Sequence, residues 1–245
     1  MPGASEARRE GNAMLTLVTI TGADDKTDPD DMVALSGEFP FVEWGILCSP
    51  KRTGTNRFPS SGWIASLPSS IRLSMHLCGA AARDVLAGGS VAKYSCGRAF
   101  DRYQLNGYTP PACDDFTSMC STHQYRWILQ ARNESSLALA VADALKFGDK
   151  ADILFDPSGG RGIETAKWPP IPSGVRLGFA GGIRPSNVAR VLAGIGHTKS
   201  PFWIDMESGV RTDEDELDLG LVRQVLEVCK SFVTCPARDR DARLK

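Results

Sequence analysis

The chain has 245 residues, with 28 lysines and arginines against 29 aspartates and glutamates, which gives a formal net charge of −1 at pH 7. A chain this close to neutrality lacks the basic surface typical of non-specific nucleic-acid binders, so we expect no nucleic-acid partner. The longest apolar runs, Leu15–Ile20 and Ser136–Leu145, are far shorter than the roughly 18 residues that a membrane span needs. An apolar fraction of 42% and a charged fraction of 23% are ordinary for a folded globular domain.

The seven cysteines are irregularly spread, and their odd number is not that of a secreted disulfide scaffold. None is separated from another by only two residues, so the sequence gives little support for a thiolate zinc site. We expect reduced thiols in a cytoplasmic protein. The cysteines are Cys48, Cys78, Cys96, Cys113, Cys120, Cys229 and Cys235.

Both ends of the chain are polar and charged. Residues 1–13 have no apolar core of the kind a secretory signal needs, so we predict a disordered tail, with Met14 as an alternative native start. Residues 236–245 predict a second, charged tail. The folded part is therefore expected over residues 14–235.

Short apolar runs at regular intervals predict eight strands. Their starts lie 24 to 30 residues apart, which leaves room in each interval for one helix and two loops. The runs are Leu15–Thr21, Phe41–Ser49, Ile71–Leu77, Asp101–Asn106, Tyr125–Ala131, Ala151–Asp156, Val175–Ala180 and Phe202–Met206.

Three helices stand out in the second half of the chain. Ser135–Phe147 begins with a serine pair that could cap it and is followed by Gly148. Pro185–Leu192 begins with proline at a first-turn position. Asp218–Cys229 carries apolar residues at helical spacing. The helical pattern is weakest over residues 86–101 and 110–124.

Repeated strand–helix units indicate a parallel sheet, and eight of them in about 250 residues match a single closed (β/α)8 barrel. A doubly wound open sheet is the alternative, but it rarely has eight regular units. We therefore predict one (β/α)8 barrel. The tryptophans inside the predicted strands, Trp44, Trp127 and Trp203, would fill its interior or its helix interface.

In such a barrel the site lies at the carboxyl ends of the strands. After the last three predicted strands the chain reads Gly159–Gly162, Gly181-Gly182 and Ser208-Gly209. Exposed backbone N–H groups in these loops could together bind a phosphate. We predict a phosphate site formed by Gly160, Gly162, Gly181, Gly182, Ser208 and Gly209.

The same segments carry a family resemblance. AGGIRPSNVARVL (Ala180–Leu192) and WIDMESGV (Trp203–Val210) resemble the end of phosphoribosylanthranilate isomerase, an enzyme of tryptophan biosynthesis. ILFDPSGGRG (Ile153–Gly162) resembles that family's sixth strand and loop. NRFPSSGWIASL (Asn56–Leu67) and YQLNG (Tyr103–Gly107) are similar to its segments after the second strand and on the fourth.

The resemblance implies an Amadori rearrangement of a phosphoribosylated amine to an aminoketose, with no metal or organic cofactor. It makes Asp156 the general acid that protonates the ribose ring oxygen. It makes Arg57 the partner of the anthranilate carboxylate, a pairing that suits a guanidinium. Thr21 and Gln104 are expected to contact the substrate, and the protein to act as a monomer or homodimer.

One departure concerns the base. The family ends its first strand with K-I-C-G, whose cysteine takes the C2′ proton, whereas this chain has Thr19-Ile20-Thr21-Gly22. A threonine hydroxyl is no base near neutral pH, and a positioned base contributes typically about 10²–10⁴-fold. Asp24, Asp25 and His76 are the candidates for its replacement. For the aspartates the alternative is a solvated loop before a helix, and for His76 a structural role.

Further departures are Glu207 in place of a serine beside the predicted phosphate, and Arg211 in place of an acidic residue. Three hypotheses follow. The first is an isomerase resembling phosphoribosylanthranilate isomerase. The second is a barrel of the same lineage that acts on a different phosphorylated compound, and the third is a phosphate-ligand-binding barrel without catalysis.

Overall fold

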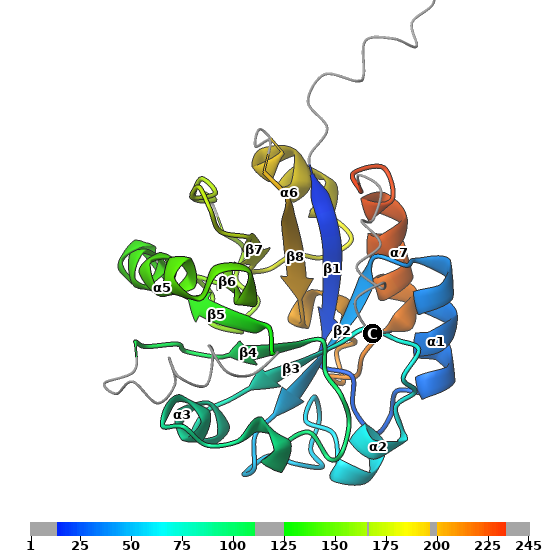
Figure 1. Ribbon diagram of the computed structural model, residues 1–245. Coiled ribbons are helices and arrows are strands. Elements are labelled where there is room, and N and C mark those ends of the chain that lie inside the picture. The colour runs from blue at the N-terminus through cyan, green and yellow to red at the C-terminus, as the bar shows by residue number, and fades with distance from the viewer. Residues whose placement is uncertain (1–13, 111–124, 166, 197–199, 234–245) are drawn as a thin grey trace, which may run out of the picture.

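The computed structural model describes residues 14–110, 125–165, 167–196 and 200–233. Within them eight parallel strands close into one barrel in chain order (Figure 1). This confirms the predicted (β/α)8 fold. The strands are β1 Leu15–Thr21, β2 Val42–Cys48, β3 Leu73–Leu77, β4 Arg102–Leu105, β5 Trp127–Ala131, β6 Ala151–Phe155, β7 Leu177–Ala180 and β8 Phe202–Met206.

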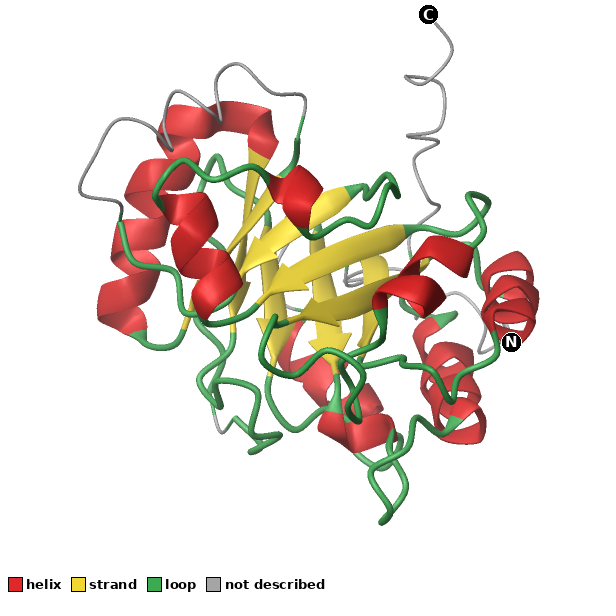
Figure 2. Ribbon diagram, turned by 90° about the horizontal axis from the view of Figure 1, so that it is seen from below, coloured by secondary structure: helices red, strands yellow, loops and turns green. Residues whose placement is uncertain are grey.

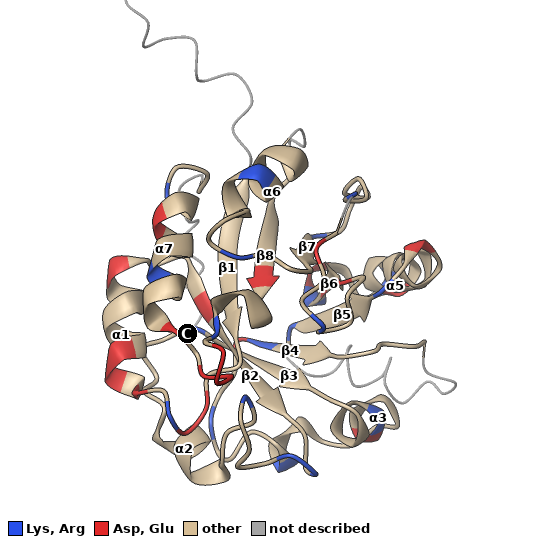
Figure 3. Ribbon diagram, turned by 180° about the vertical axis from the view of Figure 1, so that it is seen from behind, with Lys and Arg blue, Asp and Glu red and all other residues tan. Residues whose placement is uncertain are grey.

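Helices surround the strands on the outside of the ring, as Figures 1 and 2 show. They are α1 Pro29–Glu38, α2 Ser61–Ser66, α3 Ala80–Leu86, α5 Glu134–Phe147, α6 Val188–Ile195 and α7 Leu219–Cys229, with 3-10 turns η1 Val91–Lys93, η2 Gly148–Lys150 and η3 Ser208–Val210. Figure 3 shows acidic positions on α1 and both signs of charge on α7, as expected for solvated helix faces.

The units are less regular than the sequence predicted. Between β6 and β7, the described residues 156–165 and 167–176 contain no helix. This stretch is rich in glycine and proline, including Pro169, Pro170 and Pro172, and both residue types disfavour a helix interior. Most of the predicted weak region before β5, residues 111–124, lies outside the described residues, as do both predicted tails.

Two helices begin elsewhere than predicted. Asn133 caps α5, since its side chain accepts a 2.8 Å hydrogen bond from Ser136 N, and the Ser136 hydroxyl completes a capping box. The serine pair therefore lies inside the helix. For α6 the predicted start at Pro185 is three residues early, because Arg184 N donates to Asn187 Oδ1 in a turn before Val188.

The barrel interior has an apolar layer of Ile128, Leu154, Ala180 and Trp203. Trp203 is 1% exposed, and a Cβ at Gly178 would lie 2.1 Å from its ring, so the glycine makes space for the indole. Trp44 and Trp127 are fully buried, as predicted. This layer fills the barrel beneath the carboxyl ends of the strands.

Charged groups fill the opposite end of the interior. Arg102, at the start of β4, lies with Nη2 2.6 Å from Glu43 Oε1 and Nη1 3.1 Å from Asp152 Oδ2. All three side chains are buried, and the guanidinium carbon lies 4.6 Å from the centre of the Trp203 ring. These charges compensate one another, as buried charges must.

Candidate active site

A pocket opens at the carboxyl ends of the strands, where (β/α)8 barrels carry their active sites. Most of the predicted site residues line it, from several different strands and loops. They are Thr21, His76, Gln104, Asp156, Gly160, Gly162, Gly181, Gly182, Ser208 and Gly209. Of the other predicted residues, Asp24, Asp25 and Arg57 do not belong to its lining.

Asp156 follows β6 directly and is 4% exposed. Its Oδ1 accepts hydrogen bonds from Ser158 N, Ser158 Oγ and Gly159 N at 3.1, 2.7 and 3.1 Å. Its Oδ2 accepts from Gln130 Nε2 at 2.9 Å and Gly160 N at 2.8 Å. The carboxylate therefore organises the turn after β6 as well as lining the pocket.

Thr21, at the end of β1, contacts an acidic residue that the sequence analysis did not single out. The Thr21 hydroxyl donates a 2.7 Å hydrogen bond to Asp205 Oδ1 on β8, and both residues line the pocket. Burial raises the pKa of Asp205 to about 8; the Thr21 hydrogen bond lowers it, while the charges of Glu207, Asp156 and Glu43 raise it. The alternation of Trp203, Asp205 and Glu207 was the available signal, because alternate residues of a strand share one face.

His76, on β3, lies beside Thr21 at the wall of the pocket and is 1% exposed. Its Nε2 is 3.1 Å from Ser74 Oγ and its Nδ1 is 3.3 Å from Gln104 Nε2. Burial lowers the pKa of His76 to about 3, and the charge of Arg102 lowers it too, against the opposing effect of Glu43. The imidazole is therefore a weak base.

The two aspartates after β1 are engaged in loop contacts. Asp24 is 3% exposed, and its Oδ2 accepts a 2.6 Å hydrogen bond from Arg57 N. Asp25 is exposed and accepts hydrogen bonds from the backbone N–H and the hydroxyl of Ser60, the N-cap of α2. Both side chains thus hold the loop after β2 in place. The predicted alternative of a solvated loop fits the exposed Asp25 but not the buried Asp24.

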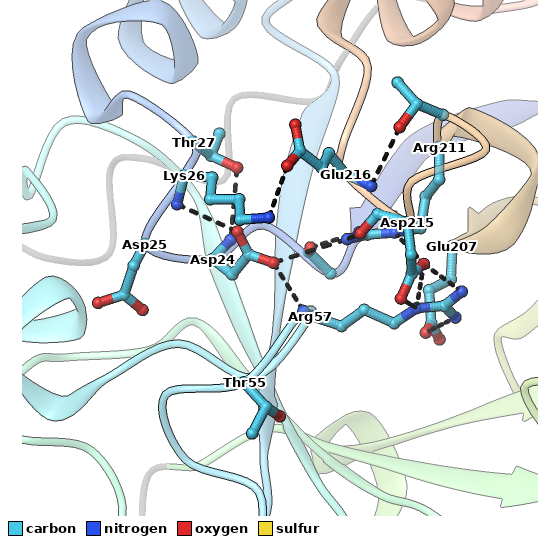
Figure 4. Close-up of polar contacts among 12 residues, drawn as sticks. Asp24, Asp25, Lys26, Thr27, Thr55, Arg57, Glu207, Arg211, Asp215 and Glu216 are labelled. Atoms are coloured by element: carbon cyan, nitrogen blue, oxygen red, sulfur yellow. Dashed lines mark hydrogen bonds and ion pairs between the residues drawn. The ribbon is translucent and has the colours of Figure 1, made fainter.

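Arg57 belongs to an ion-pair network that joins the loops after β1, β2 and β8 (Figure 4). Its guanidinium donates to both carboxylate oxygens of Asp215, at 2.8 and 3.0 Å from Nε, and Nη1 lies 2.6 Å from Glu207 Oε1. Arg211 also pairs with Asp215, through Nε at 2.8 Å, and donates to Gly22 O. The guanidinium predicted to bind a substrate carboxylate is thus paired within the protein.

The three glycine-bearing loops converge, as predicted. A Cβ at Gly162 would lie 2.8 Å from Ser208 Cβ, one at Gly182 2.5 Å from Glu164 N, and one at Gly209 1.9 Å from Ile183 O. The N–H groups of Gly162, Gly182, Ser208 and Gly209 donate no hydrogen bond to any described residue. Gly160 differs from the prediction, because its N–H donates to Asp156.

Sequence reasoning also passed over Arg132, which follows β5 and lines the pocket. Its side chain is exposed, and it forms no ion pair or side-chain hydrogen bond with the described residues. It lies close to the loop after β6, since a Cβ at Gly159 would be 3.2 Å from Arg132 Nε. An arginine at a pocket mouth is suited to an anionic group of a ligand.

Over the described ranges, no group of three or more histidine, cysteine, aspartate or glutamate side chains could hold a metal ion. In the same ranges, no helix is long and apolar enough to cross a membrane. The groups of the pocket that can bind or react with a ligand include carboxylates, side-chain amides, an arginine and backbone N–H groups.

Fold and site together define a (β/α)8 barrel with a polar pocket at the carboxyl ends of its strands, the place where enzymes of this fold carry their active sites. The family model for N-(5′-phosphoribosyl)anthranilate (PRA) isomerase matches residues 115–228. The predicted relationship to this family is thereby confirmed, and members of the family are isomerases. A comparison with curated protein sequences finds no significant match.

Solved structures of the same fold include phosphoribosyl anthranilate isomerase from Thermus thermophilus, with 20% identity and a TM-score of 0.61 over 88% of this chain and 98% of that one. TrpF from Jonesia denitrificans has 20% identity and a TM-score of 0.59 over 92% and 100%. A third isomerase, in complex with reduced 1-(o-carboxyphenylamino)-1-deoxyribulose 5-phosphate, has 19% identity and a TM-score of 0.55 over 88% and 99%.

Proposed function

We propose that the protein is an isomerase of the PRA isomerase type, which converts a phosphoribosylated aromatic amine to the aminoketose phosphate. The observation that carries the proposal is the meeting of Asp156 with three glycine-bearing loops at one pocket. The segments involved are those that resemble the family. The third related structure holds a phosphorylated aminoketose analogue, which is the class of compound proposed here.

The phosphate would bind to the N–H groups of Gly162, Gly181, Gly182, Ser208 and Gly209. Four of these groups have no acceptor among the described residues: Gly162, Gly182, Ser208 and Gly209. The 3-10 turn η3 begins at Ser208, so its first N–H groups would add to the cradle. Gly160 is left out of the set, because its N–H donates a hydrogen bond to Asp156.

Asp156 would supply the acid. A proton passes from its carboxyl group to the ribose ring oxygen, the bond from that oxygen to C1′ breaks, and the nitrogen lone pair forms a C1′=N iminium. The Asp156 carboxyl must carry a proton beforehand, so one of its five donors has to turn away when substrate binds. The Ser158 hydroxyl is the most easily rotated of them.

The carboxylate of the amine would bind Arg132. This arginine lines the pocket and has no ion-pair partner among the described residues, whereas Arg57 is already paired with Asp215 and Glu207. Arg57 was the residue implied by the family resemblance. In this chain its guanidinium would instead hold the loop after β8 beside the phosphate cradle. Thr21 and Gln104 line the same pocket and remain proposed substrate contacts.

The direct test is an assay of the purified chain with phosphoribosylanthranilate, in which the aminoketose product is measured by chromatography. Growth of a tryptophan auxotroph that lacks this isomerase, on expression of the chain, tests the same activity in cells. Turnover that disappears in Asp156→Asn is the expected result.

A buried carboxylate elsewhere provides the control for this variant. Asp143 accepts a 2.7 Å hydrogen bond from Tyr108 OH away from the pocket, so Asp143→Asn is expected to keep the turnover. A wild-type chain that binds phosphate but forms no aminoketose would contradict the isomerase and leave the hypotheses of a different substrate or a non-catalytic barrel.

A further inference from the structure

The Thr21–Asp205 pair occupies the side of the pocket where the first and last strands meet. The two strands are paired in register next to it, with Ile20 opposite Met206. Thr21 is 2% exposed and Asp205 is 6% exposed. Gly45 makes room for the pair, because a Cβ there would lie 2.2 Å from Thr21 Oγ1 and 2.8 Å from His76 Cε1. The position of the threonine hydroxyl is thus fixed by close packing.

Asp205 has an unused acceptor. Its Oδ1 accepts the Thr21 hydrogen bond, whereas its Oδ2 accepts none from the residues that the structure describes. Oδ2 is not a fully buried atom, and Asp205 lines the pocket. Oδ2 is therefore the carboxylate oxygen that a ligand in the pocket can reach.

Two of the carboxylates that line the pocket, Asp156 and Asp205, differ in their surroundings. Asp156 accepts five hydrogen bonds, three of them from backbone N–H groups, whereas Asp205 accepts one. The charged and titratable groups acting on Asp205 are Glu207 two residues later, Asp156 after β6 and Glu43 on β2, and all three raise its pKa. Two carboxyl groups in unlike environments are a common basis for acid–base division of labour.

We propose that Asp205 is the general base of this chain and that Thr21 positions it, an inference that rests on the proposed isomerase function. Oδ2 takes the proton from C2′ of the iminium. The electrons of the C2′–H bond form a C1′=C2′ double bond, and those of the C1′=N double bond return to nitrogen. The resulting enolamine tautomerises to the aminoketose: its C2′ hydroxyl gives up a proton and C1′ gains one. The substrate thus gains one proton from Asp156 at the ring oxygen and loses one from C2′ to Asp205, so no proton is gained or lost overall.

The other groups considered for this role fit less well. Asp24 and Asp25 hold neighbouring loops and do not line the pocket. His76 lines the pocket, but both of its ring nitrogens face protein side chains, at 3.1 and 3.3 Å. Thr21 has no basic atom but stands at the position of the family's cysteine, so the carboxylate it contacts is placed beside that position.

The test compares three variants across pH. Asp205→Asn is expected to lower kcat about 10²–10⁴-fold. In the wild type, kcat/KM rises with pH as Asp205 loses its proton, with a midpoint near 8. Thr21→Val removes a hydrogen bond that lowers the pKa of Asp205, so the rising limb moves to higher pH by about 0.5–1 unit. Thr21→Ser keeps the hydroxyl, so the rise of kcat/KM is expected to return to the wild-type pH.

Thr19→Val is the matched control, because Thr19 lies on the same strand, is equally buried, and donates to Glu43 outside the pocket. Its pH profile is expected to stay at the wild-type position. Turnover of Asp205→Asn within a few fold of wild type overturns this inference and leaves the isomerase function standing. A wild-type chain without isomerase activity overturns both. If Asp205→Asn does not fold, an unmoved limb in Thr21→Val overturns the inference.

Discussion

Arg57 Nη1 lies 2.6 Å from Glu207 Oε1, between the loop after β2 and the loop after β8. Glu207 lines the pocket next to Ser208, which belongs to the proposed phosphate cradle. Burial raises the pKa of Glu207, and the nearby Arg57 and Arg211 lower it. A carboxylate at this position places negative charge beside a group that would itself be anionic.

We expect Glu207→Gln to lower the KM for a phosphorylated substrate about 3- to 30-fold at low salt, because a like charge near the phosphate is removed. The amide oxygen can still accept the hydrogen bond from Arg57. Steady-state kinetics at two salt concentrations measures the effect. Glu216→Gln is the control, since Glu216 lies in the same loop but pairs with the exposed Lys26. An equal change in both variants would contradict the assignment of the phosphate to this side.

The two arginines are expected to differ. Arg132→Gln should raise the KM for an anthranilate-bearing substrate at least about 10-fold, because a charge-assisted pair to the carboxylate is lost. Arg57→Gln should chiefly lower the melting temperature, since it leaves Asp215 and Glu207 without their shared partner. Kinetics and thermal unfolding of the two variants separate these effects. The reverse pattern would assign the substrate carboxylate to Arg57, as the family resemblance implied.

A pair of glycines with nearly the same positive φ tests the phosphate cradle. Gly182 has a φ of +63° and Gly148 a φ of +62°, a region that side chains rarely adopt, so alanine at either position is strained. At Gly182 the added Cβ would meet Glu164 N at 2.5 Å, whereas at Gly148 nothing lies within 4 Å. Gly182→Ala is expected to weaken phosphate or sulfate binding at least about 10-fold by displacing the loop after β6.

Gly148→Ala is expected to lose about 1–3 kcal/mol of stability, because alanine is strained at positive φ, and to lose no phosphate affinity. Calorimetric titration with inorganic phosphate measures the affinities, and urea unfolding gives the stabilities. Equal phosphate affinity in the two alanine variants would show that phosphate does not bind where the loops after β6 and β7 meet.

The strands of the barrel could be predicted from sequence because each is buried on both faces and reads as a compact apolar run. The predicted and observed bounds of β1 and β8 are identical. The glycine-rich loops could also be predicted, because their composition is a local feature of the sequence. By contrast, Arg57 pairs with Asp215 across 158 positions of the chain, and no local pattern indicates such a partner.

Asp205 is a second residue whose role could not be predicted from the sequence. Within WIDME it reads as a polar residue in a buried strand, and its function depends on Thr21, which lies 184 positions earlier. Only closure of the barrel, which pairs the first strand with the last, brings them together. Sequence reasoning searched the loop after β1 for the missing base, whereas the structure brings a carboxylate from β8 to that place.

The last prediction concerns stability, and it does not depend on catalysis. Asp205 keeps its proton to a pKa of about 8 in the folded protein, whereas an unfolded aspartate has a pKa near 3.9. The folded state therefore holds the extra proton between about pH 4 and 8. The stabilisation of the folded state by this proton is fully present below pH 4 and is lost as the pH rises through 8. Four units of pKa correspond to a loss on the order of 5 kcal/mol.

Asp205→Asn lacks this titration, so we expect its unfolding free energy to fall less than that of wild type between pH 5 and 8.5. At pH 8.5 the variant is expected to be the more stable of the two, since it buries a neutral amide in place of an ionised carboxylate. Urea unfolding at a series of pH values measures both curves. The Thr19→Val variant, which leaves Asp205 intact, should keep the wild-type slope. Parallel curves for wild type and Asp205→Asn would show that Asp205 is ionised at neutral pH in the folded protein.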